Sequence, residues 1–148
     1  MRTIPPIASV LLLLLPGALF AQQQAAELPR TPAPEGAEVY ILSPEDGAEV
    51  TSPFTVRFGL RGMGVAPAGV QHPNTGHHHL LIDVDELPPQ NLPLPTTDQI
   101  RHFGQGQTET ELELPPGRHT LQLVLGDHLH IPHDPPVISE KITINVVE

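Results

Sequence analysis

Short apolar runs with a period of two residues recur along the chain after residue 38. Phe54, Val56, Phe58 and Leu60 alternate with other residues, so their side chains are expected on one face of a β-strand. No helical period competes with this pattern in that part of the chain. Six strands are therefore expected, at residues 39–42, 54–60, 77–84, 108–114, 118–125 and 137–147.

Proline and glycine separate the expected strands. Ser43-Pro-Glu-Asp-Gly47 and Pro115-Pro-Gly117 predict tight turns, and residues 62–76 form a long loop rich in both residue types. Residues 86–100 hold at most one short edge strand, because four prolines interrupt them. Six to seven short strands within residues 39–148 predict one all-β domain, an immunoglobulin/fibronectin-like antiparallel sandwich. A small barrel is the alternative architecture.

The N-terminus has the pattern of a secretory signal peptide. Arg2 precedes an apolar run at residues 7–15, and Ala21 offers a small residue for cleavage. Residues 1–21 are therefore expected to be removed, and residues 22–38, rich in proline and alanine, read as a tether to the sandwich. This predicts a periplasmic or secreted protein with no membrane span after processing.

Composition narrows the classes of partner. The 148 residues carry a formal net charge of −10, which repels phosphate backbones and makes nucleic acid an improbable partner. There is no cysteine, so the chain has no disulfide and no thiolate ligand or nucleophile. Apart from the initiator, Met63 is the only methionine, and an apolar role for it is more common than copper ligation.

Seven of the nine histidines fall in two short patches, His72-Pro-Asn-Thr-Gly-His-His-His79 and Asp127-His-Leu-His-Ile-Pro-His133. Neutral imidazole is the commonest protein ligand for transition metals. We take as candidate metal ligands His77, His79, His128, His130, His133, His78, Asp127 and His72. A single histidine more often has a structural role, so the hypothesis rests on the cluster.

The expected strand order brings the two patches together. In an antiparallel sandwich, strands 77–84 and 118–125 are neighbours, so the loops that carry the two patches meet at one end of the domain, and His102 lies at the same end. Alternation turns His77 and His79 outward, with imidazoles roughly 6–7 Å apart, while His78 shares the core face. His119 belongs to the opposite end.

Longer motifs resemble a known bacterial family, the domain of unknown function 4399. The resemblance covers residues 39–147, and it implies an exported, sandwich-like domain without an established activity. Among the motifs that carry it are Gly76-His-His-His-Leu-Leu-Ile-Asp83, Phe103-Gly-x-Gly-Gln-Thr-Glu109, Pro116-Gly-x-His-Thr-Leu121 and Gly126-Asp-x-x-His-x-Pro-His133.

The sequence thus favours a periplasmic, histidine-rich protein that binds copper or zinc for storage, delivery or sensing. Its expected partners are the metal ion and another periplasmic protein. One alternative is a structural or protein-interaction module without metal, and a second is a metal-dependent hydrolase or redox enzyme. The chain has no phosphate-binding glycine loop and no His-Glu-x-x-His motif, so an enzyme is the weaker reading.

Overall fold

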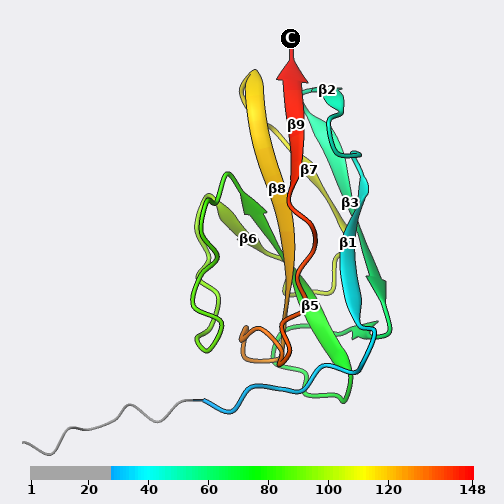
Figure 1. The fold of residues 1–148 in the computed structure, drawn as a ribbon, viewed down its shortest axis with the longest axis vertical. Helices are drawn as coiled ribbons and strands as arrows, with labels where there is room; N and C mark the ends of the chain where they lie inside the picture. Colours follow the sequence, from blue (N-terminus) through cyan, green and yellow to red (C-terminus); the bar gives the residue numbers. More distant parts are fainter. Residues whose placement is uncertain (1–27) are drawn as a thin grey trace, which may run out of the picture.

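A computed structural model describes residues 28–148, which form nine β-strands in two sheets. The predicted signal peptide and residues 22–27 of the predicted tether lie outside the described residues. The all-β prediction is confirmed (Figure 1). Within residues 28–148, no helix is long and apolar enough to cross a membrane.

The smaller sheet has three antiparallel strands in the order β1-β3-β7. Its strands are β1 (Glu38–Ser43), β3 (Phe54–Arg61) and β7 (Glu109–Leu112). Val56 and Phe58 of β3 are buried, whereas Thr55 and Arg57, which alternate with them, are exposed, as the period-two pattern predicts. This sheet therefore turns one apolar face to the interior and one polar face to solvent.

The larger sheet has six strands, with β2-β9-β8-β5-β4 in order and β6 also paired with β5. These are β2 (Glu49–Thr51), β4 (Gly64–Val65), β5 (Thr75–Ile82), β6 (Ile100–His102), β8 (Gly117–Gly126) and β9 (Ile142–Val147). The long strands pair antiparallel, as expected. Two of the three short strands differ, because β2 runs parallel to β9 and β4 parallel to β5.

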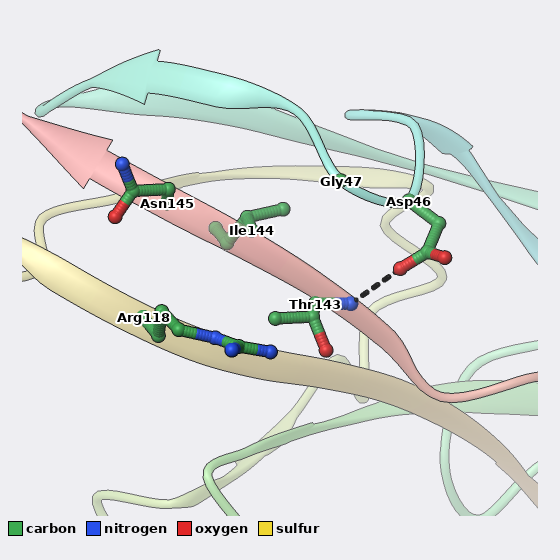
Figure 2. A pocket seen from close by; sticks show the side chains of 6 residues that line it. All are labelled: Asp46, Gly47, Arg118, Thr143, Ile144 and Asn145. Carbon is green, nitrogen blue, oxygen red and sulfur yellow. Dashed lines mark hydrogen bonds between the residues drawn. The ribbon is translucent and has the colours of Figure 1, made fainter.

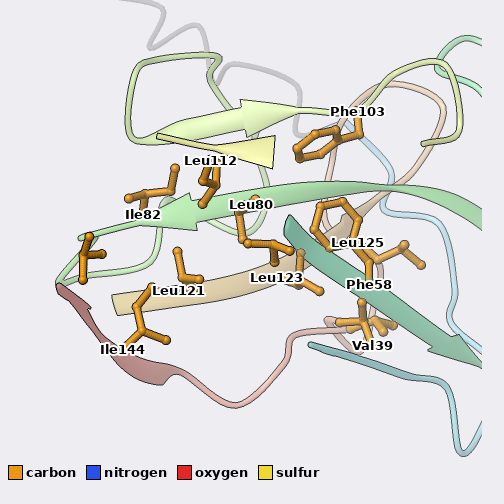
Figure 3. Close-up of a cluster of buried hydrophobic side chains, with 13 residues drawn as sticks. Val39, Phe58, Leu80, Ile82, Phe103, Leu112, Leu121, Leu123, Leu125 and Ile144 are labelled. Atoms are coloured by element: carbon orange, nitrogen blue, oxygen red, sulfur yellow. The ribbon is translucent and has the colours of Figure 1, made fainter. Parts of the chain in front are cut away.

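The core lies between the two sheets (Figure 3). Leu121, Leu123 and Leu125 of β8 point into it together with Leu80 of β5, and all four are fully buried. A second, smaller apolar cluster contains Leu81, Leu94, Ile100 and Val124. Since Leu81 is adjacent to Leu80 in a strand, this cluster covers the other face of the larger sheet, which is therefore buried on both sides.

Two of the strand boundaries that differ from the sequence prediction have a clear structural cause. The expected strand at 137–147 is divided: Ile138 forms an isolated bridge with Val124, and regular pairing resumes only at Ile142. The expected strand at 77–84 ends at Ile82 because Asp83 adopts a left-handed conformation, with φ of 54°.

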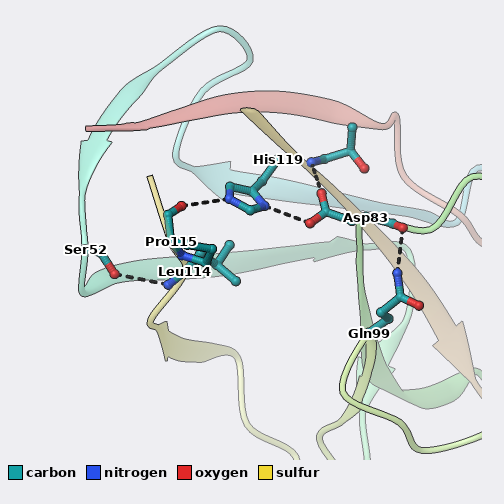
Figure 4. Close-up of polar contacts among 7 residues, drawn as sticks. Ser52, Asp83, Gln99, Leu114, Pro115 and His119 are labelled. Carbon is teal, nitrogen blue, oxygen red and sulfur yellow. Dashed lines mark hydrogen bonds and ion pairs between the residues drawn. The ribbon is translucent and has the colours of Figure 1, made fainter. Parts of the chain in front are cut away.

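Asp83 anchors the end of the domain opposite the histidine patches (Figure 4). Its carboxylate bonds to Nδ1 of His119 at 2.7 Å and accepts the backbone N–H of Thr120, while Gln99 donates to its carbonyl. Nε2 of His119 contacts the carbonyl oxygen of Pro115 at 2.9 Å. Burial lowers the pKa of His119, but the bonds to Asp83 and Pro115 outweigh it and raise that pKa overall. His119 is thus a structural residue.

Truncation of the central core should have a large effect on stability. Leu123 is fully buried, so we expect Leu123→Ala to lower the free energy of unfolding by about 2–5 kcal/mol. Leu42→Ala is the matched control, since Leu42 is 57% exposed, and should change it by less than about 0.5 kcal/mol. Urea unfolding measures both, and similar effects at the two positions would contradict this core.

Candidate metal centre

The outer face of β5 carries the first two histidines of the site. Three side chains of β5 point away from the main core, those of His77, His79 and Leu81. The side chains that alternate with them belong to that core or pack against it, and they are His78, Leu80 and Ile82. The prediction that His77 and His79 turn away from the core is thus confirmed. They do not reach solvent, however: their exposed fractions are 0% and 1%.

His102 supplies a third imidazole from the neighbouring strand. The sequence analysis placed it in a loop, but it ends β6 and lies directly opposite His79 in the antiparallel register. Residues opposite each other in such a pair turn their side chains to the same face. His102 was not among the residues predicted to bind metal, because nothing in the proline-rich stretch before it fixed the register of this short strand.

His130 supplies the fourth imidazole from the loop between β8 and β9. Its backbone is left-handed, with φ of 67°, a conformation that costs a residue other than glycine about 1–3 kcal/mol. Hydrogen bonds hold it there: its N–H donates to the carbonyl of Asp127, and its carbonyl accepts the N–H of Leu94. The loop thereby folds back over β5.

These four residues, His77, His79, His102 and His130, are called the four-histidine cluster below. One ligand nitrogen from each lies within 4.8 Å of those of the other three, and Nε2 of His77 is 3.1 Å from Nδ1 of His130. Four nitrogens bound tetrahedrally to one Zn²⁺ would be about 3.3 Å apart. Shortening the widest of these separations by about 1.5 Å would bring all four nitrogens to one ion.

Several nitrogens of the cluster are buried without a hydrogen-bond partner among the described residues. They are Nδ1 of His77, both ring nitrogens of His79 and Nε2 of His102. A buried polar atom without a partner costs about 1–3 kcal/mol. These atoms are therefore suited to bind an added ligand such as a metal ion, because ligation would remove that cost.

The other predicted ligands lie outside the cluster. His72 is exposed and contacts the carbonyl of Pro73. His128 is partly buried, and its carbonyl accepts the N–H of Gly69. The convergence predicted between the two patches is confirmed through His130, not through His128.

His78 and His133 are buried elsewhere. The ring of His78 packs on Phe58, with ring centroids 5.1 Å apart. His133 is fully buried and lies between two carbonyl oxygens, those of Thr75 at 3.2 Å and Leu125 at 3.4 Å. His133 therefore has the structural role that single histidines commonly have.

Asp127 shapes the loop that carries His130. Its carboxylate is 1% exposed and accepts the N–H groups of Leu129 and Ile131, on either side of His130, at 2.8 and 3.0 Å. The hydroxyl of Thr31 donates to its other oxygen at 2.6 Å. Asp127, predicted as a candidate metal ligand, is thus placed as an acceptor that supports the loop.

The cluster lies within a recognised sequence family. The family model described as "Domain of unknown function (DUF4399)" matches residues 56–147, a range that contains all four histidines. The chain belongs to the DUF4399 family. This confirms the resemblance found in the sequence motifs.

Other comparisons add little to the DUF4399 assignment. No curated protein matches the chain. Among solved structures, the endo-β-1,4-mannanase of Thermotoga petrophila is similar, with a TM-score of 0.43 and 19% identity over 76% of this chain. The chain spans only 20% of that enzyme's length, so the likeness carries no argument about activity.

Several surface pockets of the domain lie away from the cluster. One is lined by Asp46, Arg118, Thr143 and Asn145, near the C-terminus (Figure 2). The carboxylate of Asp46 already accepts the N–H of Thr143, and the pocket is open to solvent. It has no convergent set of chemical groups comparable to the four imidazoles.

Burial favours the neutral form of three imidazoles of the cluster, those of His77, His79 and His102. It is the main cause that lowers the pKa of His77 to about 4 and that of His79 to about 3, and the neighbouring imidazoles lower both further. Asp127 opposes the shift at His77, but only in part. Burial and then His130 also lower the pKa of His102. Neutral imidazole is the form that binds metal.

These shifts predict the pH dependence of the metal-free DUF4399 domain. Below pH 6.5 the unfolded chain protonates His77, His79 and the core residue His78, whose pKa burial also lowers to about 4, while the folded chain does not. Stability therefore falls as pH falls from about 6.5 towards 4. Each such imidazole should contribute up to about 1.4 kcal/mol per pH unit in that window. Urea unfolding at about pH 7.5 and 5.5, with a chelator present, measures the change.

The raised pKa of His119 changes stability with pH in the opposite direction. Its contribution to folding stability is present at low pH and is lost as pH rises through the pKa of the folded state. The comparison is therefore made in a His119→Gln background. His72→Gln is the matched control and should leave the pH dependence unchanged, since His72 is exposed. Equal stability at the two pH values would contradict the neutral cluster.

Proposed function

We propose that this protein is an exported metal-binding protein that holds one Zn²⁺ or Cu²⁺ ion in the four-histidine cluster. The observation that carries the proposal is the convergence of four imidazoles from three segments, with ligand nitrogens within 4.8 Å of one another. Several of those nitrogens lack a hydrogen-bond partner within residues 28–148. A bound ion would take one nitrogen of each ring as a ligand.

The ligand set favours a borderline transition metal. Imidazole nitrogen suits zinc, copper and nickel, whereas calcium and magnesium prefer oxygen ligands, and the cluster contains no carboxylate. A thioether from Met63 is not part of the set, because Met63 packs against the main core. We therefore favour Zn²⁺ or Cu²⁺ over the softer Cu⁺.

Four protein ligands suit binding better than hydrolysis. A catalytic zinc site commonly keeps one position open for water, whereas a closed site has four protein ligands. We therefore propose storage, delivery or sensing of the ion. His102 and His130 are only partly buried, which provides the side from which an ion would enter and leave.

The competing reading is a module in which the histidines only stabilise loops. His133 shows such a role, since its ring N–H can donate to one of two nearby backbone carbonyl oxygens. His79 differs, because neither of its nitrogens has a hydrogen-bond partner in the described chain. Both nitrogens of the core residue His78 also lack a partner among residues 28–148, so it is the convergence of His79 with three other imidazoles that favours metal binding over a purely structural cluster.

Isothermal titration with Zn²⁺ and Cu²⁺ tests the proposal. We expect one ion per chain in the wild type. His102→Gln and His130→Asn each remove a ligand, so they should weaken binding by more than the roughly 10–100-fold that follows loss of a residue that only supports a ligand. Asparagine tolerates the left-handed backbone at position 130. Both positions are partly exposed, so the variants should remain folded.

His72→Gln is the matched control for this titration, because His72 lies outside the cluster and should leave the affinity unchanged. Scattered surface imidazoles can reach a dissociation constant of about 10 μM. If the wild type bound no more tightly than this, the structural reading would be preferred. Equal affinity in all three variants would have the same consequence.

Export is proposed from the signal-peptide pattern of residues 1–21. Expression of the full chain in a Gram-negative host should yield a periplasmic form that begins at Gln22. Intact-mass measurement of that fraction tests the claim, with an Ala21→Pro variant as a processing-deficient control. Recovery of the chain from the cytoplasm with residues 1–21 retained would contradict export.

A further inference from the structure

The segment before β1 runs across the loop that carries His130. Residues 30–34, called the strap below, pair with residues 132–134: Ala33 donates its N–H to the carbonyl of Asp134 at 3.0 Å, and Asp134 donates to the carbonyl of Thr31 at 2.9 Å. In Figure 1 this blue segment and the orange loop lie at the same end of the molecule. The strap is thus attached, although the sequence predicted a tether.

Arg30 fixes the strap to the end of the loop. Its guanidinium donates Nε–H to the carbonyl of Pro132 at 3.1 Å and Nη2–H to the carbonyl of His133. Nη1 lies 3.4 Å from the carboxylate of Asp134. Its side chain is 22% exposed. A planar guanidinium can satisfy these acceptors together, whereas an ammonium group could not.

Thr31 connects the strap to the turn around His130. Its hydroxyl donates to Oδ2 of Asp127, and Oδ1 of that carboxylate accepts the N–H groups of Leu129 and Ile131. Asp127 is 1% exposed, so these bonds replace the water that the charge has lost. Loss of the hydroxyl would leave one oxygen of a buried carboxylate without this donor.

We propose that the strap controls the metal affinity of the four-histidine cluster, with Thr31 and Arg30 as positioning residues that hold His130 beside His77. Thr31 acts through Asp127 on the left-handed turn at His130, and Arg30 fixes the chain that follows the turn. The inference rests on the proposed metal-binding function and adds a means of regulating it.

The coupling is reciprocal. A docked strap favours the loop conformation in which Nδ1 of His130 lies 3.1 Å from Nε2 of His77. Because the four imidazoles are together in this conformation, metal binds it more tightly. A bound metal must then stabilise the docked strap by the same free energy. Anything that withdraws residues 30–34 from the loop would promote release of the ion.

Zn²⁺ titration of full-length point variants tests this inference. Thr31→Val removes the hydroxyl while keeping the shape of the side chain, and we expect it to weaken Zn²⁺ binding by about tenfold or more. Thr31→Ser restores the hydroxyl and should restore the affinity. Arg30→Lys should also weaken binding, because lysine cannot contact several carbonyls in a plane.

Matched controls exclude a general effect on folding. Thr55→Val and Arg57→Lys change exposed residues of β3, and neither should alter Zn²⁺ affinity. Amide hydrogen exchange gives a second readout in the metal-free chain. Thr31→Val should speed exchange of the Ile131 N–H, which bonds to Asp127, and of the Leu94 N–H, which bonds to the carbonyl of His130. Exchange in the centre of β8 should not change.

The outcomes separate the two proposals. If the wild type binds Zn²⁺ and Thr31→Val binds it equally well, the strap inference is overturned while the proposed function stands. If Thr31→Ser fails to restore the affinity lost in Thr31→Val, the role of the hydroxyl is overturned. If the wild type binds neither Zn²⁺ nor Cu²⁺, both proposals fail.

Discussion

The antiparallel pairing of β5 with β8 determines both faces of the larger sheet. In this register His77 lies opposite Gly126, and Leu80 lies opposite Leu123. A shift by one residue would exchange the faces of β5, placing Leu80 outside and His79 in the main core. The apolar core and the four-histidine cluster are therefore two consequences of one strand pairing.

Glycine at the end of that pairing makes room for the cluster. A Cβ atom at Gly126 would lie 2.7 Å from Cε1 of His79 and 3.1 Å from its Nδ1. Such contacts are too short, and His79 is buried, so the ring has little space in which to move. The site thus depends on a small residue as well as on its imidazoles.

The metal-free cluster has an energetic cost that the fold must offset. Its imidazoles are removed from water, and burial shifts the pKa values of His77 and His79 well below the usual range. Some of their nitrogens have no partner within residues 28–148. Metal binding would convert these unsatisfied atoms into ligands, so the features that destabilise the free domain would favour the bound one.

Much of this arrangement could be predicted from the sequence because it follows from strand periodicity. Alternation correctly separated His77 and His79 from His78, and chain reversal correctly brought the two histidine patches together. The contribution of His102 could not be predicted, because it depends on the register of a three-residue strand after a proline-rich stretch. Local pattern does not fix such a register.

Two further features depend on contacts between residues distant in the chain. The strap at residues 30–34 has the composition of a free linker, and its attachment becomes visible only through bonds to residues about a hundred positions away. The sign of the pKa shifts was also open, since Asp127 and the neighbouring imidazoles have opposite effects. Burial decides it, and burial is a property of the folded chain.

The central claim is that imidazoles from β5, β6 and the β8–β9 loop bind one ion together. X-ray absorption spectroscopy at the metal edge of the Zn²⁺-loaded chain tests it most directly. Four nitrogen ligands at about 2.0 Å, with the outer-sphere scattering of imidazole rings, are the predicted result. A first shell dominated by oxygen, or a spectrum unchanged in His102→Gln and His130→Asn, would contradict the account.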